Sequence, residues 1–231
     1  MRRPALFALT VAAAALPVLA LAAPIVTPVP VGGPFTRVES RGDFDVEVRE
    51  GSPASVEIVA EPGMGERIQV EVSGGELVLT RKRPFDSAKG VLVKVVVPEF
   101  RGLSVGGSGR GTAESGPSPR DVKLGVSGSG SLAWKGVAAA LDAGVSGSGD
   151  VKLAGRGESL KVSVSGSGSV DAKDFPVKDA SVSISGSGDV DLRLDGGTLN
   201  AQIAGSGDVT WSGEGKVGAV ATAGSGKVRR R

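Results

Sequence analysis

The amino-acid sequence predicts an all-β protein, a parallel β-solenoid with about 19–20 residues in each coil. Three observations lead to this prediction. The tripeptide Gly-Ser-Gly recurs at nearly constant intervals, apolar and polar residues alternate on both sides of it, and equivalent positions keep the same residue type from one copy to the next. No segment after residue 22 has the periodicity of an amphipathic helix.

The tripeptide marks a fixed point in a structural repeat. Its first glycines lie at positions 107, 128, 147, 166, 186, 205 and 224, so the steps between them are 21, 19, 19, 20, 19 and 19 residues. A flexible Gly/Ser linker has no reason to keep such a spacing. Glycine adopts positive φ angles without steric cost, so we interpret each copy as a tight corner.

The residues on either side of the corner have a period of two. The position two residues before each tripeptide is held by Val105, Val126, Val145, Val164, Ile184, Ile203 and Thr222. The second position after it is Gly111 in the first copy and then Leu132, Val151, Val170, Val190, Val209 and Val228. This alternation predicts a short strand that leads into each corner and another that leaves it.

Two architectures repeat a strand, a corner and a strand: a meander of antiparallel hairpins and a parallel solenoid. In a solenoid each residue lies about 4.8 Å from its own equivalent in the next coil. Such stacking explains why one position remains a β-branched aliphatic residue and why another remains serine, at Ser127, Ser146, Ser165 and Ser185. A meander imposes no such identity, so the sequence favours the solenoid.

The composition suits a narrow core of stacked aliphatic residues. The 231-residue chain has 37 glycines, 3% aromatic residues, and no cysteine, histidine or tyrosine. Without cysteine the chain has neither a disulfide framework nor a cysteine for lipid attachment.

The first 22 residues have the features of a secretory signal peptide. Arg2 and Arg3 precede an apolar run that ends at Ala20, Leu21 and Ala22, and we expect cleavage after Ala22. A retained anchor helix is the alternative, but the run is short and Pro17 interrupts it. Cleavage leaves 25 basic and 25 acidic residues, so the charge balance does not favour a nucleic-acid partner. We expect no stable membrane insertion after cleavage.

Residues 23–34 are predicted to be an extended leader, and residues 35–231 a single β-solenoid domain. Within that domain, residues 101–231 form the repeated coils and residues 35–100 an irregular β section that covers one end of the solenoid. Alternating patterns in this section predict strands at 35–39, 44–49, 55–60, 68–72, 76–80 and 91–97, with an exposed loop at 81–90. Further loops or corners are expected at 116–119, 174–176 and 196–197.

The segment Phe44–Gly51, the run Val95–Pro98 and the Gly-Ser-Gly-Asp-Val units resemble the bacterial head GIN domain family, a group of proposed auto-transporter adhesins of otherwise unknown function. The resemblance covers residues 35–231. It implies a right-handed β-solenoid in the periplasm or on the surface of a bacterium. The family has no established catalytic residues, so the resemblance assigns none.

The sequence assigns no catalytic, cofactor-binding or metal-binding residue, and we expect no cofactor. The usual nucleophile and base pairs are missing because the chain has no cysteine or histidine. Asp189 and Asp208 hold equivalent positions in adjacent coils, so a carbohydrate-active enzyme with stacked carboxylates is the alternative. Aspartate also bonds the backbone of turns. A regular calcium array is not predicted, because the position after the corner is not aspartate in most coils.

Trp134 and Trp211 lie four residues after their corners, at a position that Leu153, Ala172 and Leu192 hold elsewhere. Core packing and sugar stacking both remain open for them. The sequence as a whole predicts an exported, non-enzymatic adhesin or cell-envelope scaffold. Its exposed Ser, Thr, Lys and Asp residues would bind an unidentified surface protein or glycan, and its oligomeric state is not predicted.

Overall fold

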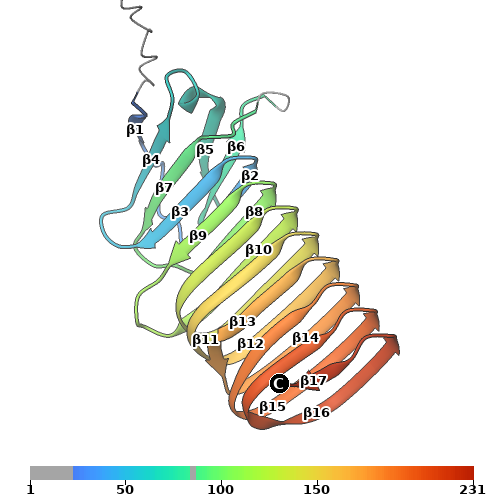
Figure 1. Cartoon of the computed structure of the whole chain (residues 1–231). Helices are drawn as coiled ribbons and strands as arrows, with labels where there is room; N and C mark the ends of the chain where they lie inside the picture. Colours follow the sequence, from blue (N-terminus) through green and yellow to red (C-terminus); the bar gives the residue numbers. More distant parts are fainter. Residues whose placement is uncertain (1–22, 84–86) are drawn as a thin grey trace, which may run out of the picture.

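The computed structural model describes residues 23–83 and 87–231, and the predicted all-β solenoid is confirmed. Its strands wind into a rod of about seven turns (Figure 1). The only helix in the part of the chain described is a short 3₁₀ turn, η1 (Gly65–Arg67). Residues 1–22, the predicted signal peptide, lie outside the described residues.

The rod consists of two facing sheets joined by the Gly-Ser-Gly corners. The strands that lead into the corners form one sheet, which we call the serine sheet; those that leave them form the opposite sheet. In sequence order the repeated coils contain β8 (Gly102–Gly107), β9 (Arg110–Glu114), β10 (Arg120–Gly128), β11 (Ser131–Gly147), β12 (Asp150–Gly166), β13 (Ser169–Val177), β14 (Asp179–Gly186), β15 (Val190–Gly205), β16 (Val209–Gly224) and β17 (Val228–Arg230).

Four of these strands are longer than the sequence predicts. β11, β12, β15 and β16 begin in the opposite sheet and end in the serine sheet, so each one bends around the side of the rod away from the Gly-Ser-Gly corners. Glycines supply this bend as well: Gly155 has a φ of 121°, and Gly196 and Gly197, at the predicted corner, have φ values of 89° and 66°. A coil is therefore one nearly continuous strand folded at two corners.

The register of the coils confirms that equivalent residues stack. All pairings between coils are parallel, and Ser127 lies opposite Ser146, which lies opposite Ser165, which in turn lies opposite Ser185. The inward-facing residues of the two sheets form one core with aliphatic side chains from every coil. The antiparallel meander is excluded by this register.

The irregular section covers one end of the rod, as predicted. Its strands are β1 (Ile25–Val29), β2 (Arg37–Gly42), β3 (Asp45–Glu50), β4 (Ser55–Ala60), β5 (Ile68–Ser73), β6 (Glu76–Arg81) and β7 (Leu92–Val97). β2 and β3 form a coil in register with β8 and β9, and β6 and β7 form another on its far side. Only at the tip do strands pair antiparallel, where β1 joins β4, β4 joins β7 and β5 joins β6. β1 lies within the segment predicted to be an extended leader.

Backbone hydrogen bonds join each corner to the corner of the coil before it. The amide N–H of the corner serine donates to the first glycine of the preceding corner: Ser148 to the Gly128 carbonyl at 2.9 Å, and Ser167 to that of Gly147 at 2.9 Å. The series begins at Gly42, whose carbonyl accepts the Ser108 N–H at 3.2 Å. The exposed serine thus contributes its backbone amide to the stack.

Replacing a corner glycine is expected to break this stack. Gly166 has a φ of 121°, and a Cβ there would clash with the carbonyl oxygen of Gly147 in the preceding coil. We expect Gly166→Ala to lower the free energy of unfolding by about 2–4 kcal/mol, because backbone strain and the clash add. Ser167→Ala, which leaves the backbone bond intact, is the control and should change it by less than about 0.5 kcal/mol. If urea unfolding shows that both variants lose the same free energy of unfolding, the stacked corner is contradicted.

The first corner has an acid-sensitive contact. The Asp43 carboxylate accepts hydrogen bonds from the Ser87 hydroxyl at 2.7 Å and the Ala88 N–H at 3.1 Å, and Arg81 lies 3.7 Å away. Burial alone would raise the pKa of Asp43, but these hydrogen bonds and the nearby guanidinium outweigh it, so the pKa lies below its usual value.

A depressed pKa stabilises the fold only while the carboxylate is charged. The contribution of Asp43 is therefore complete above its unfolded pKa of about 3.9 and is lost as the pH falls through the lower folded value. We expect Asp43→Ala to lower the free energy of unfolding by about 1 kcal/mol at pH 7. The difference in this free energy between the variant and the unchanged protein should shrink below about pH 4. Urea unfolding at a series of pH values measures this; a difference that persists unchanged at low pH would contradict it.

Candidate functional site

The outer face of the serine sheet is built from residues with very small side chains in the two columns nearest the corners. Because strand residues alternate between the two faces of a sheet, three positions per coil point outward. In the central coils the column nearest the corner is formed by Ser127, Ser146, Ser165 and Ser185, and the next one by Gly125, Gly144, Ser163 and Ser183. The rod therefore presents rows of hydroxyl groups with little side-chain bulk around them.

These rows form a shallow trough along the rod, which we call the serine trough. Its volume is about 580 Å³, and it extends from Glu39 and Ser104 near the covered end to Ser183 and Ser185. Hydroxyls in the same column lie about 4.8 Å apart, because each belongs to the next coil. Each hydroxyl can both donate and accept a hydrogen bond.

A second groove with charged walls lies beside the trough, where the chain of each coil enters the serine sheet. Its volume is about 640 Å³, its floor includes Leu141 and Leu160, and its walls carry Arg37, Arg101, Lys123, Lys161, Asp121, Asp142 and Asp179. The basic and acidic residues nearly balance. This groove therefore extends the polar surface without giving it a strong charge of either sign.

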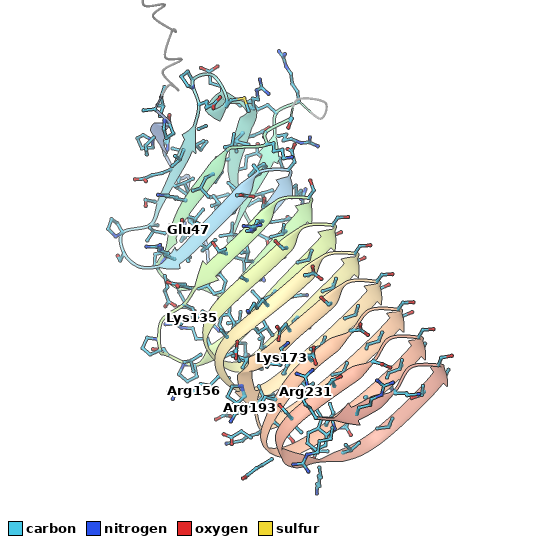
Figure 2. All side chains as sticks on the ribbon, in the orientation of Figure 1. Glu47, Lys135, Arg156, Lys173, Arg193 and Arg231 are labelled. Atoms are coloured by element: carbon cyan, nitrogen blue, oxygen red, sulfur yellow. The ribbon has the colours of Figure 1, made fainter. Side chains whose placement is uncertain are left out.

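The outer face of the opposite sheet carries more charge. Figure 2 labels Lys135, Lys173, Arg193 and Arg231, whose side chains follow one another along the rod. Lys173 lies 3.2 Å from Asp171 and 3.7 Å from Asp191, and Arg231 lies 3.8 Å from Asp191. Basic and acidic side chains on this face therefore partly neutralise each other.

Asp189 and Asp208 have a structural role. The Asp189 Oδ1 atom accepts the backbone N–H of Asp208 at 2.9 Å, and the Asp208 Oδ1 atom accepts that of Lys227 at 2.8 Å. Asp208 also lies 3.2 Å from Arg229. Asp45 and Asp150 bond the next coil in the same way. Asp189 and Asp208 thus each satisfy an amide just after the corner, where the ladder of backbone bonds is interrupted, and the geometry does not favour the catalytic alternative.

Both tryptophans pack into the core. Trp134 is 2% exposed and meets Phe175 edge to face, with ring centroids 5.5 Å apart. Trp211 is 5% exposed, and the guanidinium of Arg230 lies 4.8 Å from its ring centroid. Of the two interpretations of these residues, core packing is the one observed, because a ring stacked on a sugar must present its face to solvent.

Other kinds of site are not found in the part of the chain described. Residues 23–83 and 87–231 contain no group of three or more acidic, His or Cys side chains placed to hold a metal ion. The same residues include no helix long and apolar enough to cross a membrane.

The aspartate contacts between coils generate a testable prediction. Asp189→Ala removes the acceptor for the Asp208 amide and should cost about 1 kcal/mol, equivalent to about 2–4 °C in melting temperature for a chain of this size. Asp189→Asn keeps an acceptor oxygen and should melt close to the unchanged protein. If the two variants melt at the same temperature, the carboxylate has no such role.

Sequence reasoning found the serine column but missed the trough. The missing signal lies in the neighbouring outward column, where glycine and serine recur instead of larger residues. A depression forms only when two adjacent columns are small in the same coils. The charged groove also could not be predicted, because it depends on where the start of β2 and Arg101, just before β8, lie beside the repeated coils.

Solved structures with the same fold come from several bacteria. A putative adhesin from Bacteroides fragilis aligns over 90% of this chain and 97% of its own, with 18% identity and a TM-score of 0.77. A putative lipid binding protein from Parabacteroides distasonis has 19% identity, the same coverages and a TM-score of 0.70. A putative adhesin from Parabacteroides merdae has 18% identity, coverages of 90% and 96%, and a TM-score of 0.67. At these identities the likeness shows the fold alone.

The comparison with curated proteins gives no match. A family model described as "Putative auto-transporter adhesin, head GIN domain" matches residues 34–215, which include the irregular section and most of the coils. The match agrees with the resemblance seen in the Phe44–Gly51 segment and the Gly-Ser-Gly repeats. The chain therefore belongs to the head GIN domain family of adhesin-like β-solenoids.

Proposed function

We propose that this chain is an exported, non-enzymatic adhesin that binds a glycan, free or carried by a protein, on a cell surface or envelope. Its binding site is the serine trough. The observation that carries the proposal is the stack of outward hydroxyls on the serine sheet, which lines a depression of about 580 Å³ along the rod. Membership of an adhesin-like family supports the same function.

The chemistry of the trough suits an extended glycan. Sugar hydroxyls need partners that donate and accept hydrogen bonds, and serine hydroxyls do both. Glycines and serines keep the floor of the trough low, so a chain can lie along the rod and meet several coils. Each contact is weak because water competes for it. Adhesion then depends on many similar contacts along one chain.

The absence of catalysis is part of the proposal. Asp189 and Asp208 each accept a backbone amide of the following coil, and Asp208 also pairs with Arg229, so their carboxylates already serve the fold. They also lie at the corners, just before the strands of the opposite sheet, and do not line the trough. The predicted signal peptide supports export to the periplasm or the bacterial surface.

Filling the trough tests the proposal. Residues 23–231 with Ser146, Ser165 and Ser185 all replaced by glutamine should fold normally, because these side chains are exposed. Binding to a glycan array and to isolated bacterial envelopes should weaken at least tenfold, because the larger side chains occupy the trough. The matched control replaces Thr112, Ala133 and Thr210, one outward column of the opposite sheet, by glutamine and should bind like the unchanged protein.

Three results would contradict this function. If the trough variant and its control lose the same amount of binding, the binding site lies elsewhere. If the unchanged protein binds no glycan and no envelope, it is not an adhesin. If the unchanged protein cleaves a bound glycan, and the double variant Asp189→Asn with Asp208→Asn does not, the protein is an enzyme instead.

A further inference from the structure

The two ends of the rod expose the large apolar side chains that the lateral faces do not. Among the described residues these are Ile25 and Val26 on β1, 50% and 54% exposed, and Val217 and Val220 on β16, 42% and 44% exposed. β1 and β16 lie at opposite ends of the rod in Figure 1. We call the end with β1 and β5 the head and the end with β16 and β17 the tail.

Both sheets also have unpaired edges at these ends. At the head, β5 pairs only with β6; at the tail, residues 217–224 of β16 pair only with β15 among the described strands. Residues 217–224 contain no charged residue and no proline, the features that usually protect an edge strand from pairing. In β1, Pro28 lacks an N–H, so β5 offers the more complete edge at the head.

The head has a cavity that matches the exposed tail residues. It is a cleft of about 500 Å³ lined by the inward-facing apolar side chains of Ile25, Val29, Ile58, Ile68 and Val70, together with polar residues that include Glu61, Glu66, Gln69 and Lys82. Val217 and Val220 lie in the inward-facing columns of the last coil, which no further coil covers. A second rod placed on the tail could bury these valines in its cleft.

The charges of the two ends have opposite signs. The residues that line the cleft at the head include Glu61 and Glu66 against Lys82, a net charge of −1. Residues 213–231 carry Glu214 against Lys216, Lys227, Arg229, Arg230 and Arg231; Arg229 and Arg231 pair with Asp208 and Asp191, so the tail keeps a net charge of +2. Two tails would therefore repel each other, whereas a tail attracts a head.

We infer that the rods associate head to tail, with β16 of one copy continuing its serine sheet onto β5 of the next. The two ends differ, so the interface is heterologous and one association leaves both outer ends free for another. The cross-section of the rod is about 26 Å by 20 Å, so end-to-end contact would bury about 500 Å² of surface on each copy. This is near the lower limit for a specific interface, so we expect reversible chains at micromolar concentrations.

This assembly goes beyond glycan binding and is independent of it. Each rod has up to 11 strands in one sheet, so a chain would repeat about every 50 Å. The serine troughs of successive copies would lie in line, and linked sites bind a long glycan far more tightly than single ones.

Two variants that each block one end provide the test. Ile25→Lys blocks the cleft at the head and Val220→Lys blocks the tail, and both positions are exposed, so the fold should remain. In sedimentation velocity, residues 23–231 should form chains as the concentration rises, and each variant alone should associate at least tenfold more weakly. An equimolar mixture should form a 1:1 dimer and stop there, because it has one intact head and one intact tail.

The control variant Ala133→Lys adds the same charge on the side of the rod and should associate like the unchanged protein. If circular dichroism shows that a variant unfolds, Thr27→Lys and Val217→Lys replace the pair. Three outcomes overturn the inference: unchanged protein that stays monomeric up to millimolar concentration, Ile25→Lys that still dimerises on its own through two tails, or a mixture that stays monomeric.

Discussion

The structure depends on one repeated hydrogen bond, from the amide of each corner serine to the first glycine of the corner in the preceding coil. That bond requires two corners to lie directly over one another with no side chain between them. Glycine meets the requirement because a Cβ at these positions would clash with the carbonyl below. Once the corners are stacked, the residues of both sheets lie over their equivalents in the preceding coil, apart from a few register shifts away from these corners. The aliphatic core, the rows of serine and the aspartate contacts between coils all follow from this alignment.

Much of the fold could be predicted because the repeat is local and regular. The spacing of the corners, the alternation around them and the constant serine column together indicate a stacked solenoid, and the six strands expected before residue 100 all occur close to their predicted bounds. The order in which those strands pair could not be predicted. β2 and β3 lie between the coil formed by β6 and β7 and the coil formed by β8 and β9, so the chain leaves this coil and returns on its other side. Alternating residues indicate a strand but not its neighbours.

The candidate site could likewise be predicted only in part. The serine column is visible in the sequence, whereas the trough depends on a second column of glycine and serine that becomes adjacent only in the folded sheet. Asp189 and Asp208 were correctly placed in adjacent coils. Their partners are backbone amides, however, and the interruption of the ladder that exposes those amides is a feature of the folded corner. The features at the ends of the rod were also hidden, because Val217 and Val220 belong to columns that are buried everywhere else.

Amide hydrogen exchange of residues 23–231 tests the stacked corner most directly. The serines at 148, 167, 187 and 206 are exposed, so an unstacked loop would exchange their amide hydrogens at the rate of a free peptide. In the stacked solenoid those amides are bonded to the preceding coil and should exchange as slowly as the amides of the adjoining strands. Rapid exchange at these serines, with slow exchange in the strands on either side, would contradict the stacking of the corners.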